Sequence, residues 1–124
     1  MNQADVESFY GKMKNPADDK PISYGLNSKL VKENGVVTEK VYKLGGMYDA
    51  AIQRIVFWLD KAATVAENVE QQKTIETLIE FYKSGDLKTY DDYSVLWVED
   101  LLSQVDFVNG FTETYIDPLG MKGS

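Results

Sequence analysis

Hydrophobic residues recur at intervals of three and four positions in residues 1–14 and in much of the region 47–103, and this spacing predicts amphipathic helices. Within the second region we expect three helices, over 47–66, 69–83 and 90–103. Asn68 is placed to cap the second of these three, and Gly85 is suited to the left-handed position after its last residue. Because so few residues separate the helices predicted over 47–66 and 69–83, we expect them to pack as an antiparallel αα-hairpin.

Two other regions have the composition of β-strands. Residues 28–43 hold two β-prone runs on either side of Asn34-Gly35, a pair that tolerates the positive φ angles of a type I′ turn and so predicts a β-hairpin. Residues 105–117 mix β-branched and aromatic residues with polar ones, which predicts a half-buried C-terminal strand. The sequence therefore predicts a mainly helical α+β fold with three to four helices, including an αα-hairpin, one β-hairpin and a C-terminal strand.

Charge and composition then exclude several classes of function. The 124 residues include 13 basic and 20 acidic side chains, and the net charge of −7 disfavours nucleic acid or an anionic membrane as a partner. There is no apolar run of about 18 residues, the length of a membrane span, and no signal peptide at the N-terminus. The chain contains neither histidine nor cysteine, which excludes an ordinary zinc site, a Ser-His-Asp triad and a Cys-His pair within it. The lack of cysteine and of a signal peptide favours a cytoplasmic location.

Glu113 is the acidic residue for which the pattern itself suggests a function. Most other carboxylates lie at predicted helix ends or on polar faces, where exposure to solvent is the ordinary explanation. If the predicted strand alternates, Glu113 shares a face with Phe111, Tyr115 and Asp117. A carboxylate on such a face is costly unless it is paired or lines a wet cleft. From residue types alone, Glu113 could equally bind a ligand or be an edge-strand carboxylate exposed to solvent. Asp117 is expected to form a side-chain to backbone hydrogen bond in a turn beside Pro118.

The two tryptophans fall on different parts of the predicted helices. Trp97 lies in an apolar stripe with Tyr93, Leu96 and Leu101, so we expect these residues to pack inward. Trp58 lies off the main stripe of its helix, and we expect it to face another part of a larger protein.

Residues 109–123 read Asn-Gly-Phe-Thr-Glu-Thr-Tyr-Ile-Asp-Pro-Leu-Gly-Met-Lys-Gly, and this run resembles a segment of the dipeptidyl peptidase III family of zinc exopeptidases. Animal members have the similar pattern G-F-I-E-S-Y-R-D-P-F-G-S-R-G. The matching positions are Gly110, Phe111, Glu113, Tyr115, Asp117, Pro118, Gly120 and Gly123. Upstream segments that are similar to the bacterial branch of the family lie at 22–28, 45–48, 66–68 with 71–72, and 84–86. The sequence departs from the animal pattern at Thr112, Ile116 and Met121-Lys122, and the arginine missing at Ile116 puts in doubt any ion pair from that position.

The resemblance implies a two-lobed zinc enzyme, several times longer than this chain, that removes dipeptides from peptide N-termini. Its zinc is held by the two histidines of an H-E-x-x-G-H-type motif and a downstream glutamate, and this chain has no histidine. The resemblance therefore implies that the chain is an internal segment of the non-zinc lobe, binds no metal itself and is inactive alone. It assigns Glu113 to the free N-terminal ammonium of the peptide and Tyr115 to a hydrogen bond near the scissile bond. The implied partners are a short peptide with a free N-terminus and the zinc-binding lobe of the same polypeptide.

Two other classes of function are compatible with the residues. One is a small, non-catalytic helical interaction or scaffold domain, which a stop codon directly after Ser124 would favour over the peptidase. The other is a stand-alone enzyme that uses Glu113 and Asp117 as an acid/base pair. The small size of the chain disfavours this class, because such chemistry needs an enclosed substrate cleft.

Overall fold

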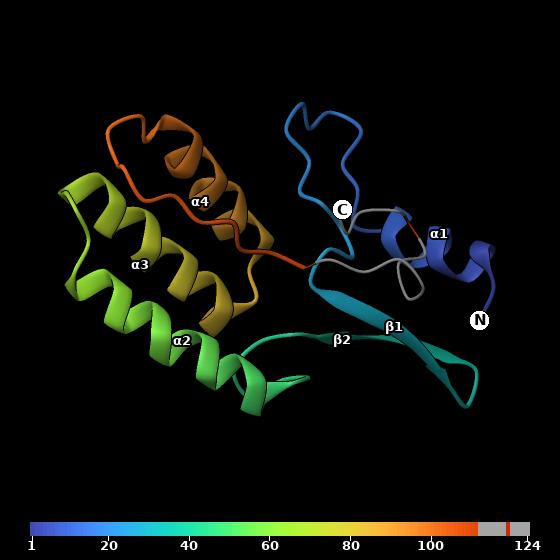
Figure 1. Cartoon of the computed structure of the whole chain (residues 1–124). Helices are drawn as coiled ribbons and strands as arrows, with labels where there is room; N and C mark the ends of the chain where they lie inside the picture. Colours follow the sequence, from blue (N-terminus) through green and yellow to red (C-terminus); the bar gives the residue numbers. More distant parts are fainter. Residues whose placement is uncertain (112–118, 120–124) are drawn as a thin grey trace. The chain divides into compact units, whose positions relative to one another are not determined.

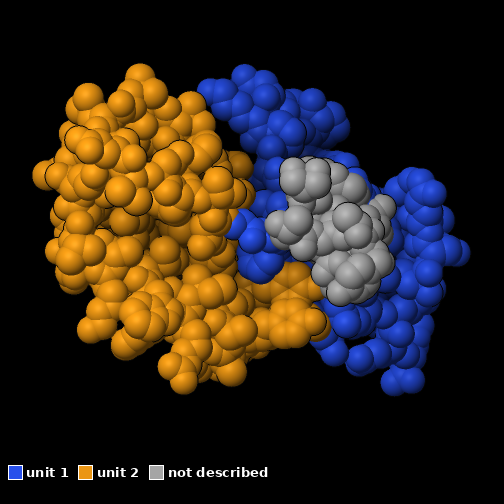
Figure 2. Space-filling model, viewed as in Figure 1, with its two compact units in different colours: residues 1–41, 110–124 blue, residues 42–109 orange. Residues whose placement is uncertain are grey.

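Six helices and strands follow one another along the part of the chain that the computed structural model describes, which is residues 1–111 and Leu119 (Figure 1). They are α1 (Gln3–Gly11), β1 (Ser28–Glu33), β2 (Val36–Val41), α2 (Asp49–Thr64), α3 (Val69–Ser84) and α4 (Leu87–Glu99). The chain forms two compact units, residues 1–41 with 110–124 and residues 42–109 (Figure 2). The predicted α+β, mainly helical fold is confirmed by four helices and one β-hairpin in the described residues.

α3 is the central helix of the unit formed by residues 42–109, because it packs against both α2 and α4 (Figure 1). Four of the residues that the sequence placed at helical spacing on α3 are buried: Ile75, Leu78, Ile79 and Tyr82. Phe81 is buried as well, and its ring lies 4.8 Å from that of Tyr90 on α4, measured between centroids. A helix that contacts two neighbours needs a wider apolar surface than one that contacts a single neighbour, which explains why Phe81 is also apolar. The αα-hairpin of α2 and α3 is confirmed.

The two ends of α3 are formed by the residues that the sequence indicated. The side-chain oxygen of Asn68 accepts the backbone N–H of Gln71 at 2.8 Å, which satisfies one of the donors left without a partner at a helix start. At the other end Gly85 has a φ of 71°, a left-handed angle that glycine adopts without steric cost, and its N–H donates to the carbonyl of Phe81 at 2.7 Å. These caps determine the length of α3 and the turn into α4.

α4 starts and ends earlier than the helix predicted over 90–103. Asp86 acts as its N-cap, since the Asp86 carboxylate accepts the backbone N–H of Lys88 at 3.0 Å. The helix ends at Glu99 because the next residue, Asp100, has extended backbone angles. Leu101 therefore lies beyond the helix and is 87% exposed, so its predicted place on the inner face is wrong.

The other unit packs α1 against the hairpin of β1 and β2. Its buried core contains Val6, Tyr10 and Leu30. β1 pairs antiparallel with β2, and the two turn residues Asn34 and Gly35 have φ angles of 51° and 79°. Both angles are positive, as a type I′ turn requires, so the predicted hairpin is confirmed. α1 is shorter than predicted and ends at Gly11.

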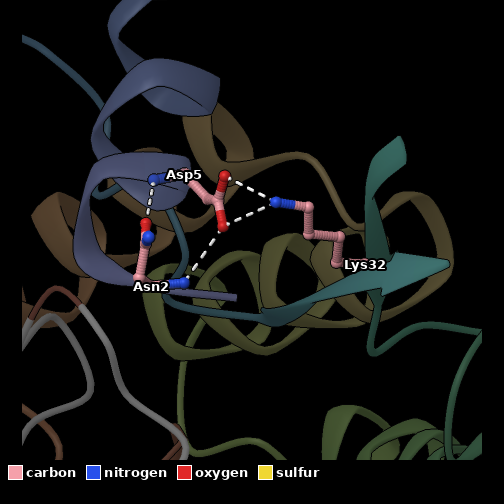
Figure 3. Close-up of polar contacts among 3 residues, drawn as sticks. All are labelled: Asn2, Asp5 and Lys32. Atoms are coloured by element: carbon pink, nitrogen blue, oxygen red, sulfur yellow. Dashed lines mark hydrogen bonds and ion pairs between the residues drawn. The ribbon is translucent and has the colours of Figure 1, made fainter. Parts of the chain in front are cut away.

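A small polar network fastens the start of α1 to β1 (Figure 3). Asn2 and Asp5 form a capping box, in which each side chain accepts the backbone N–H of the other at 3.0 Å. The ammonium of Lys32 on β1 donates to both carboxylate oxygens of Asp5, at 2.9 and 3.0 Å. The hydrogen bond from Lys32, followed by that from the Asn2 backbone, holds the pKa of Asp5 below its usual value.

Tyr10 links α1 to both strands through a second polar cluster. Its hydroxyl donates to Glu39 Oε1 at 3.0 Å, and Ser28 Oγ donates to the same oxygen at 2.5 Å. Burial raises the pKa of Tyr10 to about 12, so the phenol is protonated at neutral pH and can donate. Because Ser28 and Tyr10 are both buried, the cluster satisfies polar groups inside the unit and does not present a nucleophile to solvent.

Candidate functional site

The two residues assigned to substrate binding by the resemblance, Glu113 and Tyr115, lie outside the described residues, as does Asp117. The structure does describe the segment that leads to them, residues 100–111. After α4, residues 100–109 turn back and run beside α3 and α4 (Figure 1). Their bonds to these helices hold the chain up to Asn109, the residue before Gly110.

The segment begins with a tight turn organised by Asp100. One carboxylate oxygen accepts the backbone N–H groups of Leu102 and Ser103, each at 3.2 Å, and the other accepts the Ser103 hydroxyl at 2.6 Å. These bonds lower the pKa of Asp100 below its usual value, and the bond from the Ser103 hydroxyl has the largest effect. Asp100 is therefore a turn-forming residue, and its ionised carboxylate redirects the chain towards α3.

The first turn of α3 holds the next residues in place. The Asn68 amide donates to the Ser103 hydroxyl at 3.1 Å, and the Gln71 amide donates to the Val105 carbonyl at 2.9 Å. Glu67, just before the helix, accepts the backbone N–H of Val105 at 3.3 Å. Both backbone polar groups of Val105 are thus bonded to side chains, as they would be to a neighbouring strand in a sheet.

Asn68 has two functions in this arrangement, and two substitutions separate them. Asn68→Ala removes both the helix cap and the bond to Ser103, so we expect the free energy of unfolding to fall by about 1–2 kcal/mol. Asn68→Asp keeps an oxygen that can accept the Gln71 N–H but loses the amide donor, so the loss should be smaller. Chemical denaturation of the 124-residue chain measures both values, and equal losses would contradict the assignment of Asn68 as the cap.

Trp97 of α4 holds the middle of the segment. Its indole N–H lies 2.8 Å from the carbonyl oxygen of Phe107 and 3.0 Å from a carboxylate oxygen of Asp106. The ring is only partly buried, so Trp97 packs inward as predicted but also provides a hydrogen-bond donor that the stripe pattern did not indicate. A partly buried tryptophan usually finds such a partner for its N–H.

Asn109 is the last residue of the segment before Gly110, and two tyrosines hold it. The Tyr82 hydroxyl donates to the side-chain oxygen of Asn109, and the Tyr90 hydroxyl donates to the Asn109 carbonyl at 3.5 Å. Burial raises the pKa of Tyr82 to about 12, so this phenol is protonated and donates at neutral pH. The spacing of apolar residues over 69–83 indicates Tyr82 only as part of an apolar stripe. A tyrosine in such a stripe nevertheless indicates a hydrogen bond to another part of the chain, because a buried phenol needs a partner.

The strand predicted over 105–117 is wrong for its described part. Residues 105–111 form no β-ladder, and the rest of the predicted strand lies outside the described residues. The physical reason is that backbone groups in this part are bonded by side chains of α3 and α4 instead of by another strand. β-branched and aromatic composition indicated correctly that the segment packs on one side, but not what it packs against.

An apolar groove of about 720 Å³ lies between α2, α3 and residues 105–109. Its apolar lining includes Ile55, Trp58, Leu59, Ala62, Ile75 and Val108. Trp58 is 65% exposed, in keeping with its position off the main stripe of α2. A groove with this lining suits apolar side chains, whereas acid/base chemistry needs titratable groups directed at one another. That Trp58 faces another part of a larger protein stays a prediction.

The described residues do not have the donors of a zinc site. The whole chain lacks histidine and cysteine, and no group of three or more acidic residues in the described part lies close enough to hold a metal ion. A zinc ion therefore does not fit the residues that the structure describes. In the same part of the chain, no helix has both the length and the apolar character needed to cross a membrane.

Comparison with known proteins gives consistent matches. The profile of peptidase family M49 matches residues 22–124. Dipeptidyl peptidase 3 of Homo sapiens is 32% identical to the chain over 78 residues, and that of Rattus norvegicus is 31% identical over the same length. Dipeptidyl peptidase 3 of Dictyostelium discoideum is 28% identical over 78 residues. Each alignment covers 63% of this chain but only 11% of the relative, so the chain corresponds to a small part of these proteins.

Proposed function

Because the chain belongs to peptidase family M49, we propose that it is a segment of a zinc-dependent dipeptidyl peptidase and that it contributes to binding the substrate peptide. The observation that carries this proposal is the family match, which extends through residues 109–123 and so includes the run around Glu113 and Tyr115. Family membership also disfavours the alternative of a scaffold domain without a catalytic parent. The predicted place of the chain in the non-zinc lobe is part of the same proposal.

Glu113 provides the chemistry that an exopeptidase needs at the end of its substrate. An enzyme that removes two residues at a time must measure that length from the free amine, and a fixed carboxylate can bind the ammonium group there. A charge-assisted hydrogen bond of this kind contributes about 1.5–3 kcal/mol. Tyr115 is two positions further on, so in an extended chain its side chain would lie on the same side, about 7 Å away. That spacing suits a second polar contact with the backbone of an extended peptide.

The metal belongs to a different part of the proposed enzyme. The chain has no histidine or cysteine and its described residues do not fit zinc, so we expect the zinc ligands in the remainder of the polypeptide. The role proposed for this chain is therefore binding and orientation of the peptide, with main-chain contacts supplying much of the affinity. The chain alone should release no dipeptides.

The products formed by the full-length protein test the proposal. When it is incubated with a peptide of eight to ten residues that has a free N-terminus, mass spectrometry should show products shortened by two residues at a time. A chelator should stop the reaction, because the proposed enzyme depends on zinc. Release of single amino acids, or internal cleavage without dipeptide release, would contradict the proposed activity.

A further inference from the structure

The unit formed by residues 42–109 contains an anchor at the point where the chain leaves it towards Glu113. Asn109 is bonded through its side chain to Tyr82 of α3, and its carbonyl lies within reach of the hydroxyl of Tyr90 on α4. We propose that Tyr82 and Asn109 are positioning residues for substrate binding, because they fix the chain immediately before the residues that hold the peptide N-terminus. This inference rests on the proposed function of Glu113.

Tyr82 can act as a rigid support because its surroundings restrict it. The side chain is buried in the middle of the helical unit, on the central helix. Its ring contacts that of Phe81 with 5.3 Å between centroids, and Phe81 in turn contacts Tyr90. A hydrogen bond from a buried, closely packed phenol limits the positions that Asn109 can occupy.

The distance from this anchor to the proposed ligand of the amine is short. Glu113 follows Asn109 by four residues, so even a fully extended chain separates their Cα atoms by at most about 14 Å. Upstream of Asn109 the chain is also held, by Trp97 at Phe107 and by Gln71 at Val105. The Tyr82–Asn109 bond therefore fixes the point at which the chain starts towards Glu113, and a less well positioned carboxylate binds an ammonium group less tightly.

The test compares single-residue substitutions in the full-length protein. Tyr82→Phe removes the hydroxyl that donates to Asn109 while keeping the ring, and Asn109→Ala removes the acceptor. Asn109→Asp keeps an oxygen acceptor and serves as the rescuing variant. Tyr48→Phe is the matched control, because it removes a hydroxyl from a tyrosine of the same unit that is 64% exposed.

The readout is KM and kcat for a free-amine peptide, together with the inhibition constant of its N-acetylated form. We expect Tyr82→Phe and Asn109→Ala to raise KM for the free-amine peptide by roughly two- to ten-fold, with kcat changed by less than about two-fold. Binding of the acetylated peptide should stay the same, so the preference for a free amine should shrink. The double variant should be no worse than Asn109→Ala, and Asn109→Asp and Tyr48→Phe should resemble the wild type.

Three results would overturn the inference. If the wild type prefers the free amine and neither Tyr82→Phe nor Asn109→Ala changes that preference, the anchor does not position Glu113. Equal weakening of both peptides, or a fall in kcat that follows a loss of folded protein, would show a general structural role instead. If the wild type itself has no preference for a free amine, the proposed role of Glu113 fails as well.

Discussion

Replacing Leu78 with alanine should lower the free energy of unfolding of the 124-residue chain by about 2–5 kcal/mol. Leu78 is completely buried, with 0% of its surface exposed, on the helix that contacts both α2 and α4. The substitution removes apolar surface from the core and leaves a cavity that the neighbouring helices can fill only in part. Because small proteins have only about 5–15 kcal/mol of stability, this change should shift the denaturation midpoint strongly.

The matched control is Val98→Ala on α4. Val98 is 65% exposed, so its truncation should change stability by less than about 0.5 kcal/mol. Urea denaturation followed by circular dichroism measures both variants. If Leu78→Ala and Val98→Ala had the same effect, α3 would not be the central helix of this unit.

Acetylating the N-terminus of a substrate peptide should weaken its binding to the full-length protein by roughly ten- to a hundred-fold. Acetylation removes the ammonium group that Glu113 is proposed to hold, and such a charge-assisted bond contributes about 1.5–3 kcal/mol. The α-amino group of a peptide loses its proton near pH 8. Affinity for the free-amine peptide should therefore decline as the pH rises above about 8, while affinity for the acetylated peptide should not. Competitive inhibition measured at several pH values would test this, and parallel pH profiles for the two peptides would contradict it.

Much of the fold could be predicted because local signals determine it. The apolar residues of α3 recur at helical spacing, Asn68 is a good N-cap, and Gly85 can adopt the left-handed angle after a helix. Asn34-Gly35 likewise specifies its own turn, since both residues accept positive φ angles. In each case the residues that determine the structure are neighbours in the sequence.

The segment after α4 could not be predicted in the same way, because its conformation depends on distant residues. Val105 is bonded to Gln71, which is 34 positions away, and Asn109 is bonded to Tyr82, which is 27 positions away. Strand composition therefore suggested a sheet where helices provide the partners. The end of α4 at Glu99, four residues earlier than predicted, has a local cause. Asp100 accepts nearby backbone N–H groups, a common tendency of aspartate that competes with helix formation.

The candidate site was found through family resemblance more than through residue patterns. Residue types alone left Glu113 undecided between a solvent-exposed carboxylate and a ligand, and the family match adds support for the second interpretation. Tyr82 and Asn109 illustrate the opposite case. Nothing in their local sequence marked them as a pair, and the structure brings them together from α3 and the segment after α4.

The most direct test of the central proposal combines Glu113→Gln with acetylation of the peptide in a thermodynamic cycle on the full-length protein. Glutamine keeps the size and hydrogen-bonding oxygen of the side chain but removes its charge. We expect Glu113→Gln to weaken binding of the free-amine peptide by roughly ten-fold or more and to leave the acetylated peptide almost unaffected, so that the preference for a free amine disappears. If the variant kept the wild-type preference, or weakened both peptides equally, Glu113 would not be the residue that binds the peptide N-terminus.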